Sequence, residues 1–176
     1  VTFFHDFLKY ISDEKYKAPL DFFSWHSYAS VNANLIFANY ARETLNKYGF
    51  YNTENICNEW NPNIHIRGTL RDATNILANM LALHKTDLSM LMYYDWRLNC
   101  AYCGAFNPMD KHKPFKAYYS FKAFNELYKL KEEISVSSPK ENVFALGARA
   151  GNSVKVLIVN YTDKDCEVIL DVLGEG

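Results

Sequence analysis

The sequence lacks the features that point to nucleic acid, to a membrane or to secretion. Its formal net charge is −1 and no long run of charges has one sign, so the composition gives no sign of nucleic-acid binding or of an anionic membrane surface. No apolar stretch approaches the roughly 20 residues of a membrane-spanning helix. The opening residues, VTFFHDFLKY, lack the basic-then-apolar pattern of a signal peptide. We therefore expect a globular chain whose partner is small and neutral, not nucleic acid or membrane.

Cysteine is also scarce. The four cysteines, Cys57, Cys100, Cys103 and Cys166, are too few for a disulfide framework in 176 residues, which slightly favours a reducing compartment such as the cytoplasm. Cys100 and Cys103 form a single CxxC, a weak zinc signal without a second pair. The histidines have no spacing suited to a metal site. We expect neither a metal nor an organic cofactor.

Apolar residues, by contrast, are plentiful. They make up 49% of the chain, enough for a packed core in one domain or in pieces of two. Aromatic residues make up 16%, and stacking on a sugar-like ligand is one use for them, although most are expected to pack in the core. The sequence begins at Val1 without an initiator methionine, within an amphipathic segment, so we expect that it was cut from a longer protein.

Three short apolar runs, residues 20–26, 54–60 and 88–94, have the pattern of strands buried on both faces. A helical pattern follows each run. Ser30 or Asn32 is suited to cap the first helix and Gly49 to end it. This order, in which strands and helices alternate, predicts parallel strands with right-handed crossovers.

The second and third helices have start signals of their own. Thr69 and Asp72 have the spacing of a capping box. Pro114 is suited to the first turn of the third helix, and we expect the aromatic face at Phe121 and Phe124 to belong to the core.

The tail has a different pattern. Residues 143–149, 154–161 and 166–172 are strand-like runs joined by short turns, which predicts antiparallel hairpins. We expect a boundary within residues 135–140.

Each predicted parallel strand ends in polar and aromatic residues. The three clusters read WHSY at 25–28, NEWN at 58–61 and YYDWR at 93–97. Because ligands of parallel α/β folds bind at the carboxyl ends of strands, the clusters predict one shared site.

These clusters, together with the later segment KPFKAYYSFKAFNEL, resemble the sixth, seventh and eighth βα units of a clan A glycoside hydrolase. The sequence is most similar to glycoside hydrolase family 39, the β-xylosidase and α-iduronidase family. The resemblance implies an α/β fold in which residues 1–134 are the C-terminal portion, about three βα units, of a (β/α)8 TIM barrel. Residues 140–176 would then begin an accessory, partial antiparallel β-sandwich.

The resemblance also implies roles for single residues. Glu59 corresponds to the nucleophile of a retaining reaction, and Tyr28 to the residue that hydrogen-bonds and orients it. His26 would line the sugar pocket, and Trp60 and Asp95 would join it in binding substrate. Either Tyr94 or Trp96 corresponds to the strand-eight tryptophan of the family and would form a wall on which the sugar stacks.

A retaining glycosidase needs a second carboxyl group about 5 to 5.5 Å from the nucleophile, to serve as acid and then as base. The resemblance places that group upstream of Val1. Unless Asp95 or another carboxylate has taken this role, we expect a xyloside-cleaving enzyme that is incomplete and inactive as this chain alone.

Other interpretations remain open at this stage. Glu59 is also placed to form an ion pair with Arg67 or Arg97, and Asp95 with Arg97. His26 fits a hydrogen-bonded core histidine as well as a binding residue. The alternative function is a non-catalytic carbohydrate-binding or assembly module that forms a homo-oligomer through exposed strand edges. An esterase-like hydrolase is disfavoured because no GxSxG elbow occurs.

Overall fold

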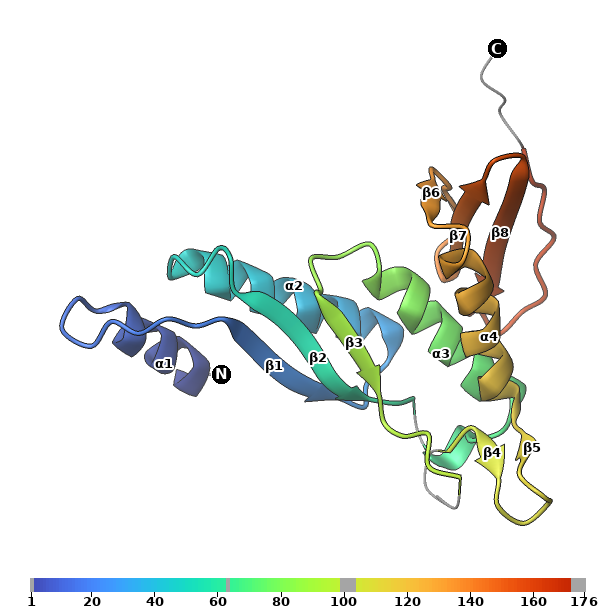
Figure 1. The fold of residues 1–176 in the computed structure, drawn as a ribbon, viewed down its shortest axis with the longest axis horizontal. Coiled ribbons are helices and arrows are strands. Elements are labelled where there is room, and N and C mark those ends of the chain that lie inside the picture. Colours follow the sequence, from blue (N-terminus) through green and yellow to red (C-terminus); the bar gives the residue numbers. More distant parts are fainter. Residues whose placement is uncertain (1, 63, 99–103, 172–176) are drawn as a thin grey trace.

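The computed structural model describes residues 2–62, 64–98 and 104–171 (Figure 1). In chain order the elements are α1 (Thr2–Ser12), β1 (Phe22–Ser27), α2 (Val31–Lys47), β2 (Glu54–Trp60), the 3-10 turn η1 (Ile64–Ile66), α3 (Leu70–Leu83), β3 (Met90–Tyr93), β4 (Phe106–Asn107), β5 (Lys113–Pro114), α4 (Lys116–Tyr128), β6 (Glu132–Ile134), β7 (Val143–Ala150) and β8 (Ser153–Asn160).

The first sheet is parallel, as the alternating strands and helices predicted. Its order is β1-β2-β3, and Cys57 in β2 pairs with Trp25 on one side and Leu91 on the other. The helices cover one face of this sheet, because Cys57 and Trp60 pack in a cluster with Ile76 of α3. The mixed α/β fold is therefore confirmed.

The other face of the parallel sheet is exposed. Phe22 is 57% exposed, Met90 45% and Met92 44%. These side chains alternate along β1 and β3 with half-buried residues that face the helices, as the period of two in a strand requires. The prediction that these strands are buried on both faces is therefore wrong for β1 and β3 in the described part of the chain, where only the face toward the helices is covered.

The helix termini follow local rules. Ser30 caps α2 by accepting a hydrogen bond from Ala33 N, and Gly49, with φ 87°, ends it. Thr69 caps α3 by accepting from Asp72 N, which is one half of the predicted capping box. The other half is displaced by one residue, because Asp72 Oδ2 accepts from Gly68 N and Thr69 N donates to Ile66 O. Burial raises the pKa of Asp72, partly offset by that Gly68 hydrogen bond.

Pro114 does not lie in the first turn of α4, so that prediction is wrong. The helix begins at Lys116. Pro114 pairs with Phe106 in the short antiparallel β4–β5 ladder, and Phe115 N donates to Ala105 O over 2.8 Å. These contacts hold the chain extended until the helix starts.

The second sheet, β6-β7-β8, is antiparallel and forms the tail sheet. Two of its three predicted strands are confirmed as β7 and β8. The third is wrong, because residues 166–171 form no strand. Side-chain hydrogen bonds from Asn160 and Thr162 to Lys164 O fold the chain into a turn after β8 instead.

The third strand of the tail sheet is β6. Gly147 of β7 makes this pairing close: a Cβ there would lie 2.7 Å from Ile134 Cγ1 and 2.6 Å from Val136 Cγ2. Ile134 falls within residues 1–134, yet its strand pairs with β7. The division of the chain into two domains stays a prediction.

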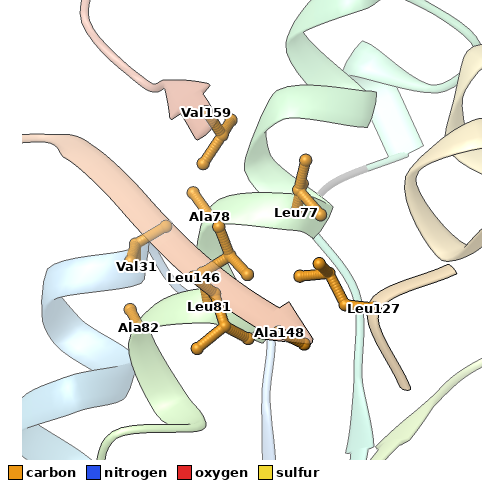
Figure 2. Packing of buried hydrophobic residues seen from close by; sticks show 9 residues of the cluster. All are labelled: Val31, Leu77, Ala78, Leu81, Ala82, Leu127, Leu146, Ala148 and Val159. Carbon is orange, nitrogen blue, oxygen red and sulfur yellow. The ribbon is translucent and has the colours of Figure 1, made fainter. Parts of the chain in front are cut away.

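One hydrophobic cluster joins the helices to the tail sheet (Figure 2). Its fully buried members are Val31 of α2, Leu77, Ala78, Leu81 and Ala82 of α3, Leu127 of α4, Leu146 and Ala148 of β7, and Val159 of β8. Helix α3 therefore contributes to the cores on both sides, beneath the parallel sheet and beneath the tail sheet.

Candidate active site

Glu59 lies at the carboxyl end of β2, opposite His26 of β1. The register between these strands shifts at Trp25 and His26, a bulge of the kind that re-aims side chains near sites. Tyr28 OH donates a hydrogen bond to Glu59 Oε1, and His26 Nδ1 lies 3.7 Å from the same oxygen. The side chain of Glu59 is 25% exposed and that of His26 54%, so both are open to solvent or to a ligand. The predicted hydrogen bond between Tyr28 and Glu59 is present.

The two arginines considered as partners of Glu59 bind elsewhere. Arg67 donates to the carbonyl oxygens of Gly104 and Phe106, over 3.3 and 3.1 Å. Arg97 donates to Asp95. Among the residues that the structure describes, neither arginine forms an ion pair with Glu59. The carboxylate is thus held by a phenol and an imidazole, both of which leave it accessible.

Asp95 forms the predicted salt bridge with Arg97. It is 8% exposed, and its Oδ2 accepts from Arg97 Nε over 2.9 Å and from Nη2 over 2.6 Å. Its Oδ1 accepts from Arg97 N over 3.1 Å. Both carboxylate oxygens therefore anchor the loop after β3, which makes Asp95 a structural element of the site's rim.

Trp60 is a core residue. It is 1% exposed and meets Tyr93 edge to face, with 5.2 Å between the ring centroids. Successive residues of a strand point to opposite faces, so Trp60 faces the helices if Glu59 faces the open side. The substrate contact that the resemblance implied for Trp60 does not fit this burial.

Tyr94 and Trp96 have different surroundings. Tyr94 is 36% exposed, and Arg97 Nη2 donates to its hydroxyl over 3.1 Å. Trp96 packs edge to face on Phe121 of α4, with 4.7 Å between the centroids, and also contacts Phe106. Of the two rings, Tyr94 is the one with a free surface.

Asn61 is a residue of the site that the sequence reasoning quoted but gave no role. It is 2% exposed, and its Nδ2 donates to Tyr94 O over 2.9 Å, so it joins the end of β2 to the loop after β3. A polar side chain directly after a strand end, next to a candidate nucleophile, was the signal available in NEWN.

Other chemistry finds little support in the described residues. Burial raises the pKa of Cys57 to about 11, so this thiol stays protonated at neutral pH. Within the described ranges no group of three or more His, Cys, Asp or Glu side chains is arranged to hold a metal ion. Cys100 and Cys103 lie outside the described residues. No helix in the described part of the chain is long and apolar enough to cross a bilayer.

Sequence comparison identifies no relative: no family model matches the chain, and no curated protein matches it. Solved structures do match. A glucosidase from Croceicoccus marinus superposes with a TM-score of 0.73 at 21% identity, over 89% of this chain and 36% of that one. A GH39 β-xylosidase from Caulobacter crescentus superposes with a TM-score of 0.63 at 17% identity, over 86% of this chain and 34% of that one.

A monomeric β-xylosidase from Caulobacter crescentus CB15 superposes with a TM-score of 0.66 at 15% identity, over 86% of this chain and 35% of that one. The chain thus spans about a third of the length of the solved structures it matches. The resemblance to family 39 is confirmed at the level of the fold: this chain has the fold of a part of these glycoside hydrolases.

Proposed function

We propose that this chain carries the nucleophile half of the active site of a retaining glycoside hydrolase of the β-xylosidase type. In this proposal the parallel sheet is a portion of a (β/α)8 barrel and the tail sheet the start of an accessory β-sandwich. One observation carries the proposal. Glu59, at the carboxyl end of a parallel strand, accepts a hydrogen bond from Tyr28 and lies beside His26. The fold shared with glycoside hydrolases supports it.

The geometry suits nucleophilic attack. Tyr28 binds Oε1 of Glu59, while Oε2 has no hydrogen-bond partner among the described residues and is left for the anomeric carbon. Attack forms a glycosyl ester with Glu59 as the bond to the leaving oxygen breaks, and a general acid protonates that oxygen. Water, activated by the same group acting as base, then cleaves the ester.

Neither Asp95 nor Glu54 is suited to be this acid. Asp95 is bound through both oxygens by Arg97. Glu54 begins β2 and Glu59 nearly ends it, five residues apart, which is about 16 Å along a strand and far beyond the 5 to 5.5 Å of a retaining pair. We therefore propose that the acid comes from a βα unit that this sequence does not contain, and that the chain alone does not turn over glycosides.

The sugar subsite is proposed on the open face of the sheet. His26 supplies a ring nitrogen for a sugar hydroxyl, and the exposed ring of Tyr94 supplies a stacking surface. Trp96 packs instead against Tyr93 of β3 and Phe121 of α4. A neutral xyloside-like glycoside fits a subsite built from one carboxylate, one imidazole and phenols.

Mechanism-based labelling tests the proposal. A 2-deoxy-2-fluoro xylosyl fluoride carries a leaving group that departs without an acid, so the first step can proceed on this chain. The glucosyl analogue is run in parallel because one structural neighbour is a glucosidase. We expect one added sugar by intact mass, mapped to Glu59 and absent from Glu59→Gln.

The matched control is Glu54→Gln, which removes a carboxylate from the other end of the same strand and should still be labelled. A folded chain that takes up neither sugar, or that is labelled equally after Glu59→Gln, contradicts the proposal. Circular dichroism establishes that each variant is folded.

The exposed face favours a second candidate, an assembly module. Phe22, Met90 and Met92 leave apolar surface open between β1 and β3, the two edge strands of this sheet. Sedimentation of the unlabelled chain distinguishes the two functions. A stable homo-oligomer without labelling of Glu59 favours assembly, and a labelled monomer favours the enzyme fragment.

A further inference from the structure

A continuous series of polar side chains, four of them buried and the last, Tyr161, half-buried, runs from the end of β1 to the end of β8; we call it the amide chain. Ser27 Oγ donates to Asn34 Oδ1 over 2.5 Å, and Asn34 Nδ2 donates to Asn79 Oδ1 over 2.7 Å. Asn79 Nδ2 then donates to Asn75 Oδ1 over 2.7 Å, and Asn75 Nδ2 to Tyr161 OH over 2.9 Å. In each of these four hydrogen bonds, the donor is the residue nearer to Ser27 along the series and the acceptor is the residue nearer to Tyr161.

The amide chain lies inside the protein. Ser27 is 5% exposed, Asn34 2%, Asn75 6% and Asn79 0%. A buried amide costs free energy unless its oxygen and nitrogen are both bonded, and here each asparagine accepts on one side and donates on the other. Apolar side chains would pack these positions without that requirement. Packing alone therefore does not explain why Asn34, Asn79 and Asn75 are bonded one to the next inside the protein.

The first member of the amide chain holds the backbone around Tyr28. Ser27 lies between His26 and Tyr28, and its Oγ accepts from Ala29 N over 3.3 Å while donating to Asn34. The next residue, Ser30, caps α2. The turn that carries Tyr28 is thus fixed at both ends, by Ser27 and by the helix start.

The last member connects the tail sheet. Tyr161 follows β8 directly, and the guanidinium of Arg71 lies over its ring, 4.4 Å from the centroid. Arg71 Nη1 also lies 3.2 Å from Asp163 Oδ1. The far end of the amide chain is consequently held in place by α3 and by the residues after β8.

We propose that Asn34 and Asn79 are positioning residues for the pair formed by Tyr28 and Glu59, and that through them the tail sheet helps to set the geometry of the site. The catalytic meaning of this inference rests on the proposed function. The positioning of the turn around Tyr28 by the amide chain does not depend on the proposed function.

The test is nuclear magnetic resonance on the full chain, whose signals report the site whether or not it reacts. Asn79→Leu keeps the branched shape and the number of side-chain heavy atoms and removes two links of the amide chain. We expect shifts in the backbone amides of Tyr28 and Ala29 and in the ring signals of Tyr28 and His26. The rate of labelling at Glu59 should fall by up to about tenfold, which corresponds to one lost hydrogen bond.

Two further variants keep the test decisive. Tyr161→Phe removes a single oxygen at the far end, keeps the ring beneath Arg71, and should produce the same shifts on a smaller scale. Ser120→Ala is the matched control, because it removes a buried hydroxyl that donates to Ala73 O of α3 over 2.7 Å, outside the amide chain. It should leave the signals of Tyr28 and His26 unchanged.

The inference is overturned if the signals of Tyr28 and His26 do not change in a folded Asn79→Leu chain. It is also overturned if Ser120→Ala shifts these signals as much as Asn79→Leu does. If Asn79→Leu does not fold, Tyr161→Phe decides by the same criterion. If the wild-type chain takes up no sugar, the proposed function fails while the resonance shifts still decide the positioning role.

Discussion

The parallel sheet β1–β3 and the tail sheet β6–β8 each have three strands, but they differ in what covers them. The tail sheet buries Leu146, Ala148 and Val159 against the helices. The parallel sheet buries Cys57 and Trp60 on its helix side and leaves Phe22 and Met92 exposed on the other. The covered surfaces hold the fold together, and the exposed surface carries the candidate site.

This difference explains where reactive groups can lie. A carboxylate beneath the tail sheet would be excluded from any substrate, whereas Glu59 on the open face of the parallel sheet is accessible. An exposed apolar face costs free energy in water and is normally covered or used for binding. Stability therefore resides in the shared core around α3, whereas the uncovered strand ends are where we propose the chemistry.

The largest expected effect tests this division directly. Leu81 is 1% exposed within the cluster that joins α3 to the tail sheet, and Leu81→Ala should lower the free energy of unfolding by about 2 to 5 kcal/mol. Met92, 44% exposed on the open face, is the matched position, and Met92→Ala should change it by no more than about 0.5 kcal/mol. Urea denaturation measures both. Equal losses would show that the open face is covered in solution.

The second prediction concerns the open face. Tyr28→Phe removes the hydrogen bond to Glu59 Oε1 and should slow labelling of Glu59 by about tenfold, because a hydrogen bond to a charged group is worth about 1.5 kcal/mol or more. Unfolding should hardly change, since Tyr28 is 43% exposed. Tyr51→Phe, at an exposed tyrosine before β2, serves as the control for labelling rate. If Tyr28→Phe is labelled as fast as wild type, then the phenol of Tyr28 does not position Glu59.

The third prediction concerns the helix that both sheets share. Thr69 accepts a hydrogen bond from Asp72 N at the start of α3, and Thr69→Ala should lower the free energy of unfolding by about 1 kcal/mol. Thr74→Ala, within the same helix, removes only a hydroxyl that donates to Arg71 O and should cost less. Hydrogen exchange should increase in both sheets after Thr69→Ala. An increase confined to one sheet would mean that α3 does not couple them.

The smallest expected effect compares one cysteine from each region. Burial raises the pKa of Cys57, beneath the parallel sheet, to about 11. A hydrogen bond between Thr162 and Cys166, together with Lys140, lowers the pKa of Cys166, after the tail sheet. Because the thiolate is the reactive form, iodoacetamide near pH 8 should modify Cys166 first, and Cys57 should react only as the pH approaches its pKa or on unfolding. Peptide mapping over time measures the order, and early modification of Cys57 would show that the sheet opens.

Much of the fold was predictable because its signals are local. The caps at Ser30 and Thr69 and the end of α2 at Gly49 all depend on neighbours within a few residues. The parallel direction of the strands followed from the alternation of strands and helices. The position of Glu59 at a strand end followed in the same way.

The secondary-structure predictions failed where contacts with residues elsewhere in the chain determine the local conformation. Residues 166–171 are strand-like in composition, but the side chains of Asn160 and Thr162 hold the preceding chain in a turn. The strand β6 has only three residues, too short for a sequence pattern, and it forms because Gly147 of β7 admits it closely. For Trp60, strict alternation from Cys57 would place the ring on the opposite face of the sheet, but the register shift between Cys57 and Trp60 brings both side chains to the helix side.

The sequence by itself determined the helices, the parallel strands and the placement of a lone glutamate at a strand end, since these follow from spacing along the chain. Only the tertiary structure decided which groups meet. The hydrogen bond from Tyr28 to Glu59 spans 31 positions, that from Asn34 to Asn79 spans 45, and that from Asn75 to Tyr161 spans 86. Such contacts depend on how the helices pack on the two sheets, and no local pattern records that packing.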